Sequence, residues 1–124
     1  MMNHIFIIKS GVILSLLCVV MGAFGAHLFA NMIGEKLDVF KTAIKYQMFH
    51  SLAIIIVGIL AKIFHLDLKL TYYLFCFGIV LFCGSLYLIS IFKYSFLGAI
   101  TPLGGILFIL GWVVLFYKLS YNIS

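Results

Sequence analysis

The sequence contains no arginine, and only three of its 124 residues are acidic. Charged residues make up 9% of the chain, whereas a soluble domain has about a quarter. Such a chain cannot cover a water-facing surface with polar groups, so its surroundings are predicted to be mostly lipid. The lysines stand singly near the ends of apolar segments rather than on one face, which argues against a nucleic-acid partner.

Motifs of catalysis and of metal binding are missing too. The three cysteines, Cys18, Cys76 and Cys83, lie inside apolar runs and lack the CxxC spacing of metal sites. They are predicted to be buried thiols. With no catalytic signature in the chain, the sequence predicts no enzymatic activity, no metal site and no cofactor.

Long apolar runs dominate what the chain does contain, and 66% of its residues are hydrophobic. A bilayer-spanning helix needs about 20 apolar residues, and continuous runs favour helices over the alternating strands of a barrel. The prediction is a single all-α domain over residues 1–124, an integral membrane four-helix bundle. The predicted transmembrane helices cover about residues 5–28, 46–64, 70–92 and 98–117, and residues 31–41 could form an interfacial helix.

The N-terminal segment imitates a secretory signal peptide, because Lys9 precedes the apolar residues 12–20 and the small residues around Phe24. The apolar run already starts at Ile5 and is longer than a signal-peptide core, so a retained spanning helix is predicted. Four spans place four lysines on each side, and only the amino terminus tips the positive-inside rule. The small excess of positive charge predicts that both termini lie on the cytoplasmic side of an inner cell membrane.

A polar stripe enters the second span. Thr42, Tyr46 and His50 are spaced four apart and share one helix face, with Gln47 on its flank. His27 ends the first span and is predicted to lie at a similar depth. The connections place further polar groups of the third and fourth spans in the same leaflet. The predicted cluster comprises His27, Thr42, Tyr46, Gln47, His50, Ser85, Tyr87 and Thr101.

Two interpretations of this cluster stay open. In the structural one, the side chains hydrogen-bond one another or backbone carbonyls across helices. In the functional one, they handle a proton, a metal ion or a small ligand, as ionisable groups at membrane depth commonly do. A metal site needs three or more ligands, and the spans offer two histidines without a carboxylate, although Glu35 and Asp38 of the loop could reach them.

Small residues predict where helices approach closely. Gly104 and Gly105 begin the fourth span, and Gly84 in the third span is their predicted counterpart. The complete set of predicted packing residues is Gly22, Gly25, Ala26, Gly84, Gly104 and Gly105.

Four blocks, one for each span, occur in order: GAFGAH (22–27), TAIKYQMFHS (42–51), FCGSLYLIS (82–90) and GAITPLGGILFILGW (98–112). As a set they resemble domain-of-unknown-function family 423. That family consists of small multi-pass bacterial inner-membrane proteins related to a small animal mitochondrial membrane protein. The resemblance implies a multi-pass membrane protein and brings no activity, substrate or cofactor with it.

The favoured function is a non-enzymatic small membrane component or accessory subunit. The predicted partner is the lipid bilayer. Further copies of the chain or a larger membrane complex could be partners too. The alternative is a small transporter that handles a proton or solute through His27 and His50. A haem- or metal-dependent redox protein is the least favoured of the three.

Overall fold

The computed structural model describes residues 3–123, and within that range it contains helices and no strand. Four helical stretches are long and apolar enough to cross a membrane: His4–Leu28, Ala30–Phe64, Lys69–Phe92 and Ser95–Tyr121. The predicted all-α four-helix architecture is therefore confirmed. In chain order the elements are α1 (His4–Val20), η1 (Met21–Gly25), α2 (Ala26–Leu28), α3 (Ala30–Ile33), η2 (Gly34–Lys36), α4 (Leu37–Phe64), α5 (Lys69–Gly78), η3 (Ile79–Cys83), α6 (Gly84–Phe92), η4 (Ser95–Ala99) and α7 (Thr101–Ile123).

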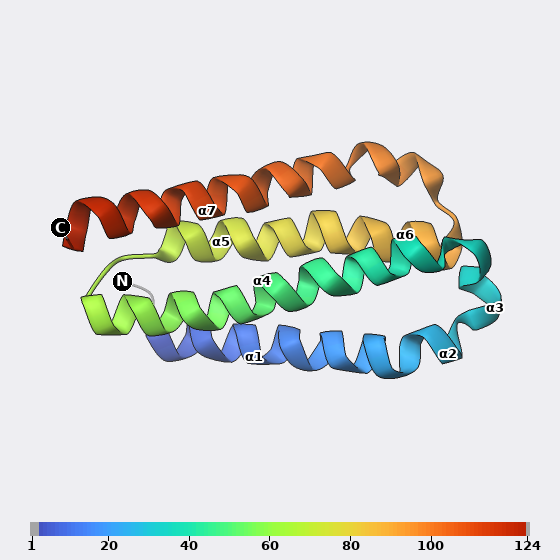
Figure 1. Cartoon of the computed structure of the whole chain (residues 1–124), viewed down its shortest axis with the longest axis horizontal. Helices are drawn as coiled ribbons and strands as arrows, with labels where there is room; N and C mark the ends of the chain where they lie inside the picture. Colours follow the sequence, from blue (N-terminus) through green and yellow to red (C-terminus); the bar gives the residue numbers. More distant parts are fainter. Residues whose placement is uncertain (1–2, 124) are drawn as a thin grey trace.

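The four stretches run alongside one another in alternating directions (Figure 1). α1 packs along α4, α7 packs along α5 and η3, and the two pairs meet where α4 contacts α6 and η3. The stretches through α4 and through α5–α6 are the inner ones, with 44% of each apolar window buried. The stretches through α1 and α7 are the outer ones, with 17% and 22% buried, so most of their side chains face the surroundings.

The second span begins earlier than predicted. Gly34 has a φ of +51°, which ends the preceding helical turn, and α4 then runs unbroken from Leu37. No proline or glycine occurs in α4 before Gly58, so nothing interrupts the helix ahead of the membrane. The residues expected to form a separate interfacial helix within 31–41 are instead divided between α3, η2 and the start of α4.

Two of the four stretches contain a π-turn, η1 in the first and η3 in the third. A π-turn holds one residue more than an α-turn, so the residues beyond it are rotated by about 100° relative to an uninterrupted α-helix. The residues after η1, His27 among them, therefore face a different direction from the one that α-helical periodicity predicts.

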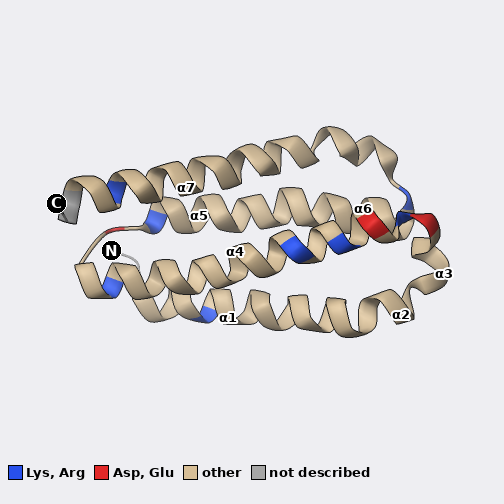
Figure 2. Ribbon diagram, in the orientation of Figure 1, with Lys and Arg blue, Asp and Glu red and all other residues tan. Residues whose placement is uncertain are grey.

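Most charged residues lie towards the two ends of the bundle, whereas lysines on α1 and α4 lie further in (Figure 2), and both termini lie at the same end (Figure 1). At the opposite end, the ammonium group of Lys93 donates hydrogen bonds to the carbonyl oxygens of Ile33 and Ser90. These bonds join the end of α3 to the end of α6, where helix carbonyls have no partner in their own helix. A cluster of buried apolar side chains, Ile33, Phe40 and Ile91, packs beside these bonds.

Candidate functional site

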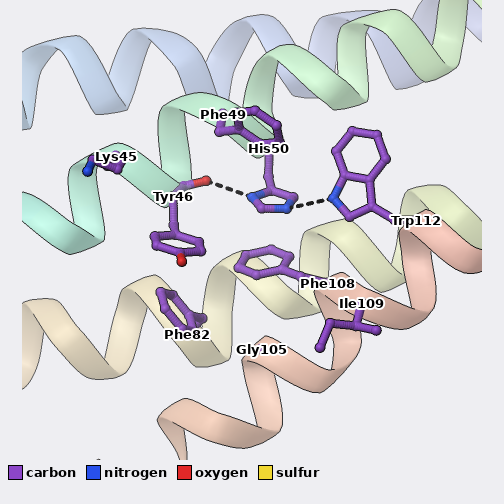
Figure 3. A pocket seen from close by; sticks show the side chains of 9 residues that line it. All are labelled: Lys45, Tyr46, Phe49, His50, Phe82, Gly105, Phe108, Ile109 and Trp112. Carbon is purple, nitrogen blue, oxygen red and sulfur yellow. Dashed lines mark hydrogen bonds between the residues drawn. The ribbon is translucent and has the colours of Figure 1, made fainter.

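A groove opens between α4 and α7, and η3 forms its floor (Figure 3). Its volume is about 510 Å³. Phe49 and Ile109 on its rim are exposed, so the groove is open to the surroundings of the bundle. It is lined by Lys45, Tyr46, Phe49 and His50 of α4, by Phe82 of η3, and by Gly105, Phe108, Ile109 and Trp112 of α7.

His50 is buried in the wall of this groove, and both of its ring nitrogens are hydrogen-bonded. Nδ1 lies 2.9 Å from the carbonyl oxygen of Tyr46, and Nε2 lies 3.1 Å from Nε1 of Trp112 (Figure 3). A carbonyl oxygen only accepts a hydrogen bond, and an indole N–H only donates one. The geometry therefore requires a neutral imidazole with its proton on Nδ1, because a proton on Nε2 would face the indole N–H.

Aromatic rings hold the groove in shape. The His50 ring stacks on Phe108, with centroids 3.6 Å apart and an angle of 10° between the planes. Tyr46 packs on Phe82 at a centroid distance of 4.5 Å, and Trp112 packs against Phe75 at 5.0 Å. Ring contacts of this kind are geometrically specific, so the walls and floor have a defined arrangement.

The backbones of α7 and η3 touch at Gly104. A Cβ atom there would overlap the backbone nitrogen of Phe82 and lie 2.7 Å from its Cα. At Gly105 the added atom would be 3.8 Å from the Phe82 ring, an ordinary contact. Gly84 has nothing within 4 Å, so the expectation that it faces Gly104 is corrected: the counterpart is Phe82.

The predicted packing residues of the first span lie at the end of the bundle opposite the termini. A Cβ at Gly25 would lie 2.9 Å from Cζ of Phe40, whereas Gly22 faces Ile44 at 3.6 Å. Ala26 packs against the same cluster as Phe40. Sequence reasoning missed four glycines at which a Cβ would lie within 3 Å of a neighbouring helix: Gly11, Gly58, Gly78 and Gly111.

The predicted polar cluster divides into separate groups. Gln47 is buried; its Nε2 donates to the carbonyl oxygen of Leu14 at 3.0 Å, and its Oε1 accepts from the Tyr87 hydroxyl at 2.6 Å. Ser85 and Thr101 form a second pair, with their hydroxyl oxygens 2.5 Å apart. Three helices thus meet at Gln47, while the other pair joins α6 to α7.

Two predicted members lie elsewhere. His27 is exposed on α2, and Thr42 is exposed on α4, where its hydroxyl donates to the Asp38 carbonyl oxygen at 2.9 Å. The hydrogen bonds and ring contacts of His50 come from α4, α5 and α7. The expected meeting of His27 with His50 is therefore corrected, and so is their predicted similar depth. Gly25, two residues before His27, faces Phe40. Phe40 lies ten residues, or about 15 Å along α4, before His50.

Metal ligands do not gather in the described part of the chain. Among residues 3–123, no group of three or more His, Cys, Asp or Glu residues could hold a metal ion. Cys18 and Cys83 are buried free thiols, and Cys76 is half-buried. The Cys18 thiol donates to the carbonyl oxygen of Ile44 at 3.3 Å, which gives it a packing role between α1 and α4.

Sequence reasoning did not place Phe82, Phe108 or Trp112 in the site. One signal was available: Trp112 is the chain's single tryptophan and lies halfway along α7. Tryptophan favours the membrane–water interface, and its N–H needs an acceptor when it is buried more deeply. A search for that acceptor would have led to His50.

Comparison with known proteins fits this architecture. The family described as "Protein of unknown function (DUF423)" matches residues 21–105, more than half of the chain. The chain belongs to this family. The DUF423 match includes the α4 wall and the η3 floor of the groove and ends at Gly105, the first lining residue of α7. The expected family resemblance is thereby confirmed.

Curated relatives of this DUF423 protein carry membrane-protein names. The UPF0382 membrane protein YwdK of Bacillus subtilis (strain 168) is 46% identical over 114 residues, which covers 90% of this chain and 92% of the relative. The UPF0382 membrane protein SSP2132 of Staphylococcus saprophyticus is 41% identical over 112 residues, with coverage of 90% and 92%. No solved structure matches the chain. With its four spanning helices, the chain is a multi-pass membrane protein.

Proposed function

We propose that this protein is a non-enzymatic component of the cell membrane whose groove holds one chain-bearing amphiphile from the lipid phase. The engagement of both His50 nitrogens carries the proposal. The Nδ1 proton is directed at the Tyr46 carbonyl, and the Nε2 lone pair is taken by the Trp112 N–H. The imidazole therefore acts as a fixed part of the wall rather than as a reactive group.

The groove has the chemistry of a binding site for an apolar chain. Ligand sites have volumes of roughly 300–1,000 Å³ and are mostly apolar with a few polar groups. At about 510 Å³, this groove falls in that range. Its lining is aromatic and aliphatic apart from Lys45, the Tyr46 hydroxyl and the hydrogen-bonded rings of His50 and Trp112. Because the rim opens sideways between two helices, a ligand would enter from the bilayer.

Proton or solute transfer through His27 and His50 has less support. His27 is exposed on α2, whereas His50 is buried between α4 and α7. A proton passing through His50 would have to break the Tyr46 or Trp112 hydrogen bond at each step. A metal-dependent redox role would need ligands that do not gather among residues 3–123. An accessory position in a larger complex is compatible with a lipid-filled groove.

The single tryptophan provides the test. We expect a brominated lysophospholipid, titrated into the detergent-purified protein, to quench Trp112 fluorescence saturably at about one equivalent, because the indole lines the groove. An unbrominated lysophospholipid should reverse the quenching. The matched control is the double variant Trp112→Phe/Val113→Trp, which moves the indole to an exposed neighbouring position at similar depth outside the groove.

In that control, quenching should rise in proportion to the quencher without saturating, as for random lipid contacts. Equal, non-saturating quenching of both reporters would overturn the proposed function. Release of a stoichiometric amphiphile from the purified wild-type protein on extraction, measured by mass spectrometry, would support it independently.

A further inference from the structure

We propose that the amphiphile is an anionic glycerophospholipid, with its phosphate at Lys45 and one acyl chain lying along the groove towards Trp112. The inference rests on the proposed function and names the class of its ligand. Lys45 and Trp112 mark the two ends of the groove, with the Tyr46, Phe82 and Phe108 rings between them (Figure 3).

The charge at the outer end of the groove fits a phosphate. Lys45 is exposed there, and Lys41, one helical turn earlier, is exposed beside it. Asp38 lies one helical turn before Lys41 on the same face, and α4 has no acidic residue after it. Among the residues that line the groove, Lys45 is the charged one. Figure 2 shows neighbouring lysine turns in blue on α4, with an acidic turn in red beyond them. A lysine at the membrane surface strengthens the binding of anionic lipid by about fivefold.

The depth of Lys45 in the membrane also fits contact with a lipid phosphate. On α4, Lys45 and Lys62 enclose residues 46–61, which contain no Lys, Asp or Glu. This segment is about 24 Å long, while the hydrocarbon core of a bilayer is about 30 Å thick. Lysine side chains reach outward over the difference, so Lys45 lies at the phosphate level of one leaflet. His50 is then about 7.5 Å deeper, beside the first part of an acyl chain.

The shape of the groove favours a lipid over a partner helix. The hydrogen bond between His50 and Trp112 crosses from α4 to α7 at the inner end of the groove. A helix is about 10 Å wide and continues across the whole membrane, so it would have to pass this crossing. An acyl chain is narrow and flexible, and it can turn out into the bilayer where the groove ends.

The experiment compares headgroups on identical chains. The full-length protein is placed in phosphatidylcholine nanodiscs that contain a small fraction of either phosphatidylglycerol or phosphatidylcholine with brominated chains. We expect brominated phosphatidylglycerol to quench Trp112 several-fold more effectively at equal mole fraction. Lys45→Gln should remove that preference, while Lys62→Gln, an equal loss of charge at the other end of α4, should keep it.

The outcomes separate the two proposals. Saturable lysophospholipid quenching at Trp112 without any headgroup preference in nanodiscs would overturn this inference and leave the proposed function standing. A preference that survives Lys45→Gln would also overturn it, because the phosphate would then be bound elsewhere. Trp112 shielded from both brominated lipids in a protein that is dimeric in nanodiscs would show a partner helix in the groove and overturn both.

Discussion

Gly104 and Gly84 both lack a Cβ atom, but the space where that atom would lie is filled at Gly104 and open at Gly84. Gly104 meets the backbone of Phe82, and backbone atoms cannot rotate away as the end of a side chain can. Gly84 has open space where a Cβ would point. Of these two glycines, therefore, only Gly104 is required for helix packing, and the motif GG or GS alone does not show which glycine that is.

Alanine substitutions should separate these two glycines. We expect Gly104→Ala to lower the free energy of unfolding by about 1–3 kcal/mol, because α7 must move away from η3. Gly84→Ala should leave stability unchanged or raise it by up to about 1 kcal/mol, because alanine is the better helix former. Reversible unfolding in mixed micelles measures both. Equal destabilisation by the two variants would contradict the packing at Gly104.

At the scale of elements, the π-turn η3 links the two halves of the third span. Beyond η3, α6 presents Ser85 to Thr101 of α7, and within η3 Phe82 lies beneath Tyr46. A continuous α-helix would rotate α6 by about 100° relative to α5 and could not keep the contacts of both. The π-turn therefore decides which residues reach the groove.

Deleting one residue of η3 should convert the π-turn into an α-turn. Val80 is exposed and makes no contact with the groove, so its deletion removes little except the extra residue. We expect helix content by circular dichroism to be retained, the thermal midpoint to fall, and the saturable quenching of Trp112 to be lost. Deletion of the exposed Ser120 near the end of α7 is the control and should preserve all three.

At the scale of the whole molecule, four antiparallel spans place both termini at one end of the bundle (Figure 1). The lysines at that end are Lys9, Lys62, Lys69 and Lys118, and those at the other end are Lys36, Lys41, Lys45 and Lys93. Lys93 is already engaged with carbonyl groups of α3 and α6. The amino terminus adds one charge to the first group, which favours a cytoplasmic position for that end.

Epitope tags test this topology. We expect tags at either terminus, and one inserted beside Asp67, to be protected from protease in intact spheroplasts and cleaved in inverted vesicles. A tag at Ser95 should behave in the opposite way. Termini on opposite sides would contradict the four-span fold. All three tags exposed in spheroplasts would reverse the orientation and retain the fold.

By itself, the sequence determined the membrane environment and the number of spans. Apolar run length and charge content are local properties, and they do not depend on which helix faces which. Periodicity also placed Tyr46 and His50 together on α4, and Gln47 on their flank, because that helix has no π-turn.

Only the tertiary structure decided how the polar and aromatic groups pair. The packing of η1 on α4 sets His27 near the level of Phe40 rather than of His50, and the packing of α7 on η3 brings Trp112 to His50. Both outcomes depend on contacts between segments far apart in the chain. The groove is the clearest case, because its walls come from α4 and α7 and its floor from η3, and no local pattern shows that these elements meet.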